Sequence, residues 1–237
     1  MKLVDLADGP LLETFHRELL ATSFVPDQLV TLDDLREQLG AGTLVASVVV
    51  DGDGGLLAGL VGEWSPSTRL MLLSYLVVAP GARGTGIGGY LYAEVVEGWR
   101  SGYAPCAILA EVESPTHHTG SPAYGDPAAR LRFYQRRGAR LLDVPYLQPA
   151  LAPGLARVDG LLLLALHVAP ELYGPDGADT MASPPLHQFM VHYFLGTEGE
   201  IPDDPDGSAL LAAMDVPGGV PLRPIEQYRE VEARVRS

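Results

Sequence analysis

A group of glycines around one arginine is the first set of residues whose types suggest chemistry. Residues 77–91 read VVAPGARGTGIGGYL, with five glycines between positions 81 and 89 and Arg83 among them. Glycines let backbone N–H groups approach a ligand closely, and at the start of a helix those groups and the helix dipole attract an anion. Arg83 adds a fork of donors suited to phosphate. The segment therefore predicts a cradle for a pyrophosphate.

Other interpretations of the same glycines remain open at this point. Residues 84–89 fit the dinucleotide pattern G-x-G-x-x-G, and Glu111 follows at about the separation of the acidic residue that binds ribose. That pattern requires the first strand of a βαβ unit, whereas this loop follows the fourth predicted strand. A P-loop would need a Gly-Lys-Ser/Thr sequence, which does not follow. A purely structural turn is the remaining alternative, although so many glycines cost backbone entropy.

Three glutamates could do acid–base work. Glu111 and Glu113 are two residues apart in a predicted strand, so their side chains share a face. Glu63 lies near the end of another strand that is otherwise apolar. A carboxylate in an apolar cleft has a raised pKa and can accept a proton near neutral pH. The alternatives are an ion pair or a solvated strand face.

The neighbouring His117 and His118 follow the strand that carries Glu111. They could serve as a base or contact a substrate. A histidine pair also suggests a metal, but no third ligand stands at a helpful spacing, so no metal site is expected. An exposed pair in a loop is the simpler interpretation.

Hydrophobic periodicity and turn residues indicate the elements that must position these groups. A capping box at Thr31 and Asp34 and a cap at Asp126 with Pro127 in the first turn mark two helix starts. Gly- and Asp-rich residues between two of the strands indicate a hairpin. Strands are predicted at 2–7, 43–51, 55–65, 69–78, 106–114, 139–151 and 161–168, with helices at 9–24, 31–40, 86–99 and 127–138. This order is not the strict alternation of a doubly wound fold.

Composition narrows the class of protein. The 237 residues are 47% hydrophobic and 19% charged, as in a packed globular chain, and the longest apolar run, 160–169, is too short to span a membrane. The N-terminal residues lack the features of a signal peptide, and one cysteine, Cys106, excludes an internal disulfide. We expect a cytoplasmic protein. One lysine and no asparagine favour a GC-rich bacterial genome.

The formal net charge of −14 argues against nucleic acid as a partner, because binding a phosphate backbone needs a cationic surface. It mildly favours cationic partners such as amines or basic peptides. Simple solubility is the alternative explanation.

Two linked motifs resemble the GCN5-related N-acetyltransferase (GNAT) superfamily. In YLVVAPGARGTGIGGYL, the positions of Arg83, Gly86 and Gly88 are similar to the family's acetyl-CoA motif Arg/Gln-x-x-Gly-x-Gly/Ala. Downstream, LRFYQRRGARLL resembles the family's helix-then-strand segment, and LAEVES resembles its fifth strand. The resemblance covers roughly residues 1–170. It implies an α/β (α+β mixed) acyl-CoA N-acyltransferase fold, with a mixed, mostly antiparallel sheet of six to seven strands flanked by helices.

The resemblance also implies roles for particular residues. Backbone groups near Leu76, Val77 and Val78 would pair with the pantetheine arm of acetyl-CoA, used as acyl donor. The amides of residues 83–88 would hold the pyrophosphate: Arg83, Gly84, Thr85, Gly86, Ile87 and Gly88. The acceptor amine would attack the thioester directly, with Tyr134 as general acid and Glu111 as base, Glu113 and Glu63 being further candidates. Ser74 and Tyr75 would line the acceptor side.

Two features depart from the family or lie outside the resemblance. Relatives often place an asparagine seven residues before the tyrosine, where this chain has Pro127 beside Asp126, so that contact with the acetyl-CoA is absent or replaced. Residues 171–237 are expected to form a helical C-terminal extension, packed on a 1–170 acetyltransferase domain or in a homodimer contact. The acceptor is a small-molecule or protein amine. A catalytically idle acyl-CoA-binding module for regulation or assembly is the alternative function.

Overall fold

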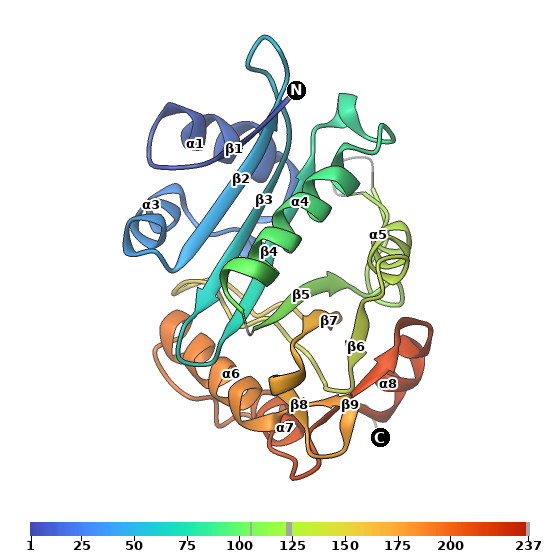
Figure 1. Ribbon diagram of the computed structural model, residues 1–237. Coiled ribbons are helices and arrows are strands. Elements are labelled where there is room, and N and C mark those ends of the chain that lie inside the picture. The colour runs from blue at the N-terminus through green and yellow to red at the C-terminus, as the bar shows by residue number, and fades with distance from the viewer. Residues whose placement is uncertain (105, 122–124, 236–237) are drawn as a thin grey trace. The chain divides into compact units, whose positions relative to one another are not determined.

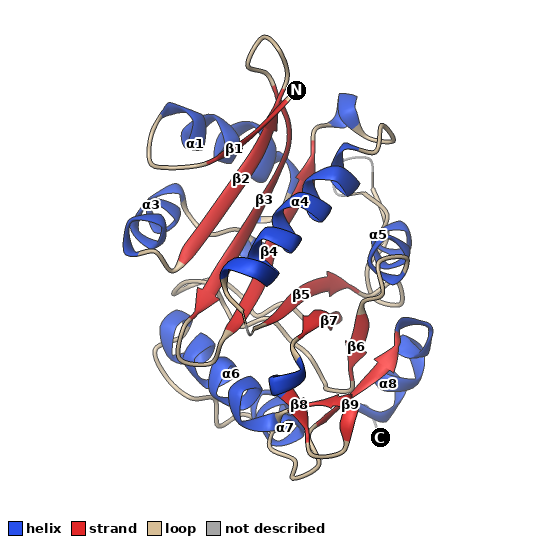
Figure 2. Ribbon diagram, in the orientation of Figure 1, coloured by secondary structure: helices blue, strands red, loops and turns tan. Residues whose placement is uncertain are grey.

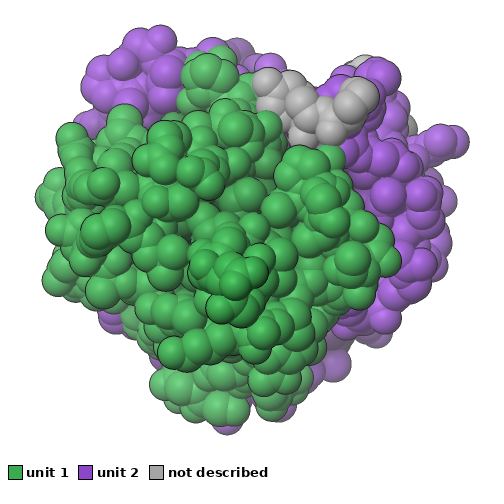
Figure 3. Space-filling model, turned by 90° about the horizontal axis from the view of Figure 1, so that it is seen from above, with its two compact units in different colours: residues 1–64, 71–104 green, residues 65–70, 105–237 purple. Residues whose placement is uncertain are grey.

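The computed structural model describes residues 1–104, 106–121 and 125–235, which form two compact units coloured separately in Figure 3. Unit 1 comprises residues 1–64 and 71–104, and unit 2 comprises residues 65–70 and 105–237. Part of the segment between the strand predicted at 106–114 and the helix predicted at 127–138 lies outside the described residues. In the described part of the chain, no helix is long and apolar enough to cross a membrane.

Unit 1 is built on four neighbouring strands in the order β1-β2-β3-β4, visible in Figure 2. The strands β1 and β2 pair antiparallel, as do β2 and β3, and β4 follows β3 through a hairpin. The strand bounds are β1 Lys2–Asp5, β2 Leu44–Val50, β3 Leu56–Ser65 and β4 Leu70–Val78. All four predicted strands of this unit are therefore confirmed, each within a few residues.

Helices cover both faces of these strands (Figure 1). On one face lie α1 Pro10–Phe15, a π-helical turn His16–Leu20, α2 Ala21–Ser23 and α3 Leu32–Ala41; on the other lies α4 Ile87–Gly102. Phe15 packs so tightly on β3 that a Cβ at Gly59 would lie 2.1 Å from its ring. On the opposite face a Cβ at Gly62 would lie 2.3 Å from Trp99 of α4. Two strand glycines thus let an aromatic ring approach each face.

The predicted capping box of α3 is present. The Thr31 hydroxyl accepts the Asp34 N–H at 3.2 Å, and the Asp34 carboxylate accepts the Thr31 N–H at 3.2 Å. The helix continues past Gly40 to Ala41, and its C-cap, Gly42, takes the left-handed conformation at φ 72°. The helix predicted at 9–24 is helical from Pro10 to Ser23, with a π-helical segment, His16–Leu20, in its middle.

Unit 2 contains six strands in the order β5-β7-β6-β10-β9-β8. Strand β7 lies between β5 and β6 and pairs antiparallel with both. The strand bounds are β5 Ala107–Glu113, β6 Arg140–Leu142, β7 Leu161–Val168, β8 Tyr173–Gly174, β9 Gly177–Met181 and β10 Val220–Pro224. The helices are α5 Pro127–Gln135, α6 Ser183–Thr197, α7 Pro205–Met214 and α8 Tyr228–Val235. The sole cysteine, Cys106, precedes β5 and is 0% exposed.

Two expectations about unit 2 need correction. The strand expected at 139–151 is only Arg140–Leu142, because Pro145 and Pro149 have no N–H to give to a ladder. The described residues form ten strands in all, more than the expected six to seven, since the extension adds β8, β9 and β10 to its helices. Strand β10 pairs antiparallel with β6, with Leu222 opposite Leu142.

An ion-pair network joins the extension to the loop before β7. Arg157 donates to both carboxylate oxygens of Glu198, at 2.8 and 2.7 Å, and to Asp204 at 2.6 Å. Its guanidinium also lies over the ring of Phe194 at 5.3 Å. Hydrogen bonding from Arg157 is the largest cause that lowers the pKa of Glu198, while for Asp204 the Gly207 N–H is the largest cause and Arg157 adds to it.

We expect Arg157→Met to destabilise unit 2. Breaking three charge-assisted hydrogen bonds to partly exposed carboxylates typically lowers the free energy of unfolding by about 2 kcal/mol after solvent screening. In a chain of this size that lowers the melting temperature by roughly 4–8 °C. Both carboxyl groups have folded-state pKa values below their ordinary values of 4.5 and 3.8. Their contribution to the stability of the folded state is therefore present above about pH 4.5, and it is lost as pH falls through their folded-state pKa values. Thermal unfolding of both proteins from pH 7 to pH 3 should show the difference shrink with acidity; an equal difference at all pH values would contradict this account.

Candidate active site

The glycine loop connects β4 to α4 within unit 1. After Val78 the chain makes a short 3₁₀ turn at Pro80–Ala82, and Arg83 is extended. Gly84 and Gly86 then take the left-handed conformation at φ 79° and 89°, and Gly86 is the N-cap of α4. A side chain at either position would be strained whatever the available space. The two glycines are therefore required by the path of the backbone.

The same loop has the properties of an anion cradle. A Cβ at Gly84 or at Gly86 would meet nothing within 4 Å, so the space beside both residues is open. No side chain caps the N-terminus of α4, which leaves the first-turn N–H groups to another partner. The Thr85 hydroxyl donates to the Ala82 carbonyl at 2.7 Å and so stays within the loop. These features fit a bound phosphate group.

The remaining residues predicted to bind acetyl-CoA surround this loop. Arg83 is exposed, and its Nε donates to the Val78 carbonyl at 3.3 Å. Val77 is buried in the core with α1 and α3, whereas Leu76 and Val78 are half-buried. A Cβ at Gly88 would lie 2.9 Å from a methyl of Val78, so this glycine lets the start of α4 pack on the end of β4. Ile87 is buried beneath the helix start.

Strand β4 has an irregularity before the loop. Met71 faces α4, since its sulfur lies 3.0 Å from a Cβ placed at Gly62, where Trp99 also packs. Tyr75 belongs to the core on the opposite face, with α1 and α3. Two residues four apart would share a face in a regular strand, so the alternation changes phase between them. Such irregularities re-aim side chains and are common beside active sites.

Glu63 and Ser74 meet at this irregularity. The Ser74 hydroxyl donates to the Glu63 carboxylate at 2.6 Å. Burial raises the pKa of Glu63, and the hydrogen bond from Ser74 opposes part of that rise. A raised pKa is the property expected of a general base.

Tyr75 has a structural role in unit 1. Its hydroxyl donates to the Gln28 carbonyl and accepts the Val30 N–H, both at 3.1 Å. Its ring meets Phe24 edge-on at a centroid distance of 4.9 Å. The side chain therefore fixes the segment between α2 and α3 against β4.

Glu111, in unit 2, is held by two side chains that the sequence did not suggest. The Tyr146 hydroxyl donates to its Oε1, and the Gln148 amide donates to its Oε2 at 3.0 Å. Both donors lie in the segment that was expected to be a strand. The two prolines in that segment, Pro145 and Pro149, were the available sign that it would leave the sheet.

The Gln148 side chain is incompletely satisfied. The residue is 6% exposed, and its Oε1 has no hydrogen-bond partner among the described residues. A buried acceptor without a partner is unfavourable and needs an explanation, such as a donor supplied by a ligand or by water.

The other predicted residues of unit 2 have defined surroundings. Glu113 is paired with Arg130 at 3.0 Å and lies 3.8 Å from the ring of His118, so the ion-pair interpretation applies to it. Tyr134, in the last turn of α5, is 3% exposed. Asp126 caps α5 by accepting the Ala128 N–H at 2.9 Å, as predicted.

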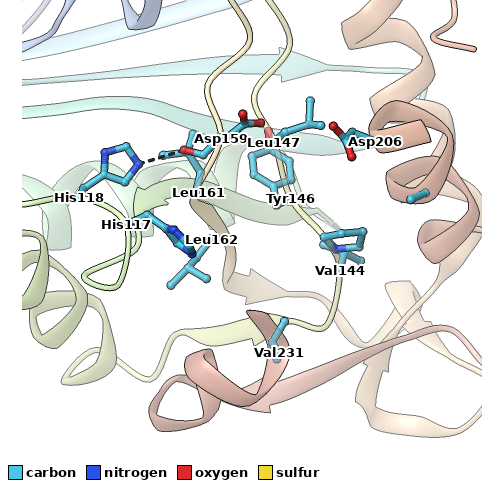
Figure 4. A pocket seen from close by; sticks show the side chains of 13 residues that line it. His117, His118, Val144, Tyr146, Leu147, Asp159, Leu161, Leu162, Asp206 and Val231 are labelled. Atoms are coloured by element: carbon cyan, nitrogen blue, oxygen red, sulfur yellow. Dashed lines mark hydrogen bonds between the residues drawn. The ribbon is translucent and has the colours of Figure 1, made fainter. Parts of the chain in front are cut away.

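The histidine pair lines a pocket. His118 donates through Nε2 to the Asp159 carbonyl at 3.0 Å, and both His117 and His118 line a cavity of about 540 Å³ within unit 2 (Figure 4). A Cβ at Gly160 would lie 2.6 Å from His117, and φ of Gly160 is 70°, so only glycine fits beneath the pair. The two histidines are thus a closely packed part of the pocket wall.

Comparison with known proteins gives a clear result for the fold. No protein-family model matches the sequence, and no curated protein matches it. Among solved structures, a protein from Bacteroides thetaiotaomicron assigned to the GNAT acetyltransferase family aligns with a TM-score of 0.55 at 22% identity, over 70% of this chain and 86% of its own. The protein has the GNAT fold. The predicted class, an open sheet flanked by helices in the acyl-CoA N-acyltransferase fold, is thereby confirmed.

Two further GNAT-fold enzymes align less closely. The ribosomal-protein-S18-alanine N-acetyltransferase from Escherichia coli has a TM-score of 0.47 at 13% identity, over 71% of this chain and 95% of its own. An IAA acetyltransferase from Bacillus cereus has a TM-score of 0.45 at 17% identity, over 69% of this chain and 98% of its own.

The raised pKa of Glu63 leads to a test. Ser74→Ala removes a hydrogen bond that lowers this pKa, so the pKa should rise further, as followed by ¹³C NMR titration of the carboxyl. Ser101→Ala, which removes an exposed hydroxyl on α4, is the control and should leave the pKa of Glu63 unchanged.

A folded-state pKa of Glu63 above the ordinary value of 4.5 destabilises the fold as pH rises from the ordinary value to the folded-state value. Glu63→Gln should therefore be more stable than the parent at pH 7 and equal to it near pH 4; a less stable variant at pH 7 would refute the assignment.

Proposed function

We propose that this protein is an N-acetyltransferase that moves the acetyl group of acetyl-CoA to a primary amine. The observation that carries the proposal is the loop from Arg83 to Gly88, with left-handed glycines, open space beside them and an uncapped helix start. The GNAT fold supports it. The proposed donor contacts are the backbone near Leu76, Val77 and Val78 for the pantetheine arm and the loop amides for the pyrophosphate.

In the proposed reaction the neutral amine nitrogen attacks the thioester carbonyl carbon. A C–N bond forms, the C–S bond breaks, and the sulfur leaves as a thiolate that takes up a proton. The chain must therefore accept one proton from the ammonium and give one to the sulfur. Acetyl-CoA supplies the activated acyl group, and no metal is part of the proposal.

We propose Glu63 as the group that accepts the ammonium proton, directly or through water. Its raised pKa supports this role, and its partner Ser74 lies in β4, the strand that leads into the glycine loop. Glu113 is a weaker candidate because Arg130 neutralises it. Tyr134 remains the proposed acid for the thiolate.

The donor site is tested by two glycines of the same loop. Gly86→Val places a side chain at φ 89° beside the proposed phosphate position, so affinity for CoA should fall at least tenfold in calorimetric titration. Gly81→Ala is the matched control, since Gly81 has no positive φ and its Cβ would meet open space. Unchanged CoA affinity in Gly86→Val, with intact thermal unfolding, would rule out the cradle.

Tyr134→Phe tests the chemical step. Loss of a general acid should lower kcat by about 100-fold or more, with little change in CoA affinity, in an assay that follows thiol release. Turnover equal to the parent would remove Tyr134 from the mechanism. A parent protein that binds acetyl-CoA yet releases no CoA with any amine would favour the idle acyl-CoA-binding module.

A further inference from the structure

A pocket of about 540 Å³ lies within unit 2, and its walls come from both the GNAT-like region and the C-terminal extension. His117 and His118 belong to the loop after β5, and Tyr146 and Leu147 to the segment after β6. Asp206 and Ala209 of α7 and Val231 of α8 complete the wall (Figure 4). Its volume is in the range of sites for small organic molecules. Nothing in the donor site described above uses it.

The lining selects the charge of an occupant. The wall combines apolar and polar surface, and its side chains that can carry charge near neutral pH are the two histidines and the carboxylates of Asp159 and Asp206. Among the lining residues that the structure describes there is no lysine or arginine, and no described residue donates a hydrogen bond to either carboxylate. An anionic ligand would find no fixed positive charge here. An organic cation would meet two carboxylates and, in the whole chain, a net charge of −14.

One lining residue, Tyr146, is hydrogen-bonded to a buried polar pair outside the pocket. The ring of Tyr146 lines the pocket while its hydroxyl donates to Glu111, and Gln148 donates to the same carboxylate. Gln148 is 6% exposed, and its Oε1 accepts from no described residue. Glu111 and Gln148 are not themselves lining residues, so Tyr146 is the side chain that links the pocket wall to this pair of polar groups.

We propose that this pocket binds a primary amine with an apolar body, and that the extension, through α7 and α8, sets which amine is accepted. Within the proposed function, on which this step rests, that amine is the acetyl acceptor. The apolar part of the wall receives the carbon skeleton, the carboxylates attract the cation, and Tyr146 connects the pocket to Glu111. The extension is then a specificity element.

Direct binding tests the chemical class without catalysis. Phenethylamine, octylamine and spermidine, with phenylacetate and octanoate as anionic counterparts, are titrated calorimetrically into the full-length protein in the absence of acetyl-CoA. We expect at least one amine to bind with a Kd below about 1 mM and at least tenfold more tightly than the carboxylates. Asp159→Asn and Asp206→Asn should each weaken the affinity for the amine by about two- to fivefold. If no amine binds better than its carboxylate counterpart, the proposal is wrong.

Two alanines of α7 test the location. Ala209 lines the pocket and is exposed, so Ala209→Trp fills the cavity without disturbing the core. Ala212, also exposed on α7 but outside the lining, provides the control Ala212→Trp. Amine binding should be lost, or KM for the amine raised at least tenfold, in Ala209→Trp alone, with CoA affinity unchanged in both.

The outcomes separate this inference from the proposed function. Amine binding that is lost in Ala209→Trp, in a protein that never releases CoA, would keep the amine pocket and reject the transferase. Acetyl transfer with the same amine KM in Ala209→Trp as in the parent would keep the transferase and reject the pocket as the acceptor site.

Discussion

The approach of helix α4 to the end of strand β4 is the constraint on which the proposed donor site depends. Gly88 allows the first turn of the helix to touch Val78, and the left-handed Gly84 and Gly86 turn the chain sharply enough to make that contact. The result is a helix start without a side-chain cap, with open space beside Gly84 and Gly86. An anion site of this kind is made by backbone geometry, so the side chains around it can vary while the function is kept.

Local signals in the sequence were enough to predict much of the fold. The capping box at Thr31 and the aspartate cap at Asp126 fix helix starts with residues only a few positions apart, and the strands of unit 1 follow from apolar runs between turn residues. Two motifs at their usual separation predicted the GNAT fold, and the structural comparison confirms it. The glycines of the loop also indicated a sharp turn, because a left-handed backbone conformation favours glycine.

The rest depends on contacts between distant residues. The partners of Glu111 come from 35 and 37 residues further along the chain, in a segment whose apolar pattern resembles a strand. The raised pKa of Glu63 follows from its burial, and the hydrogen bond from Ser74 on the neighbouring strand opposes part of that rise; no local pattern shows either effect. The strands of the extension are only two to five residues long, too short for periodicity to reveal, and β10 is defined by its pairing with β6. The roles of the individual site residues stay predictions.

The burial of Cys106 has a consequence for its exchange with thiols and disulfides in solution. Free CoA is itself a thiol, and in its oxidised form it exchanges with accessible cysteines to leave mixed disulfides. The chain has a single cysteine, and that residue is 0% exposed in front of β5. Exchange requires a reachable thiolate, so burial protects Cys106 from capping by CoA disulfides and from forming a disulfide-linked dimer.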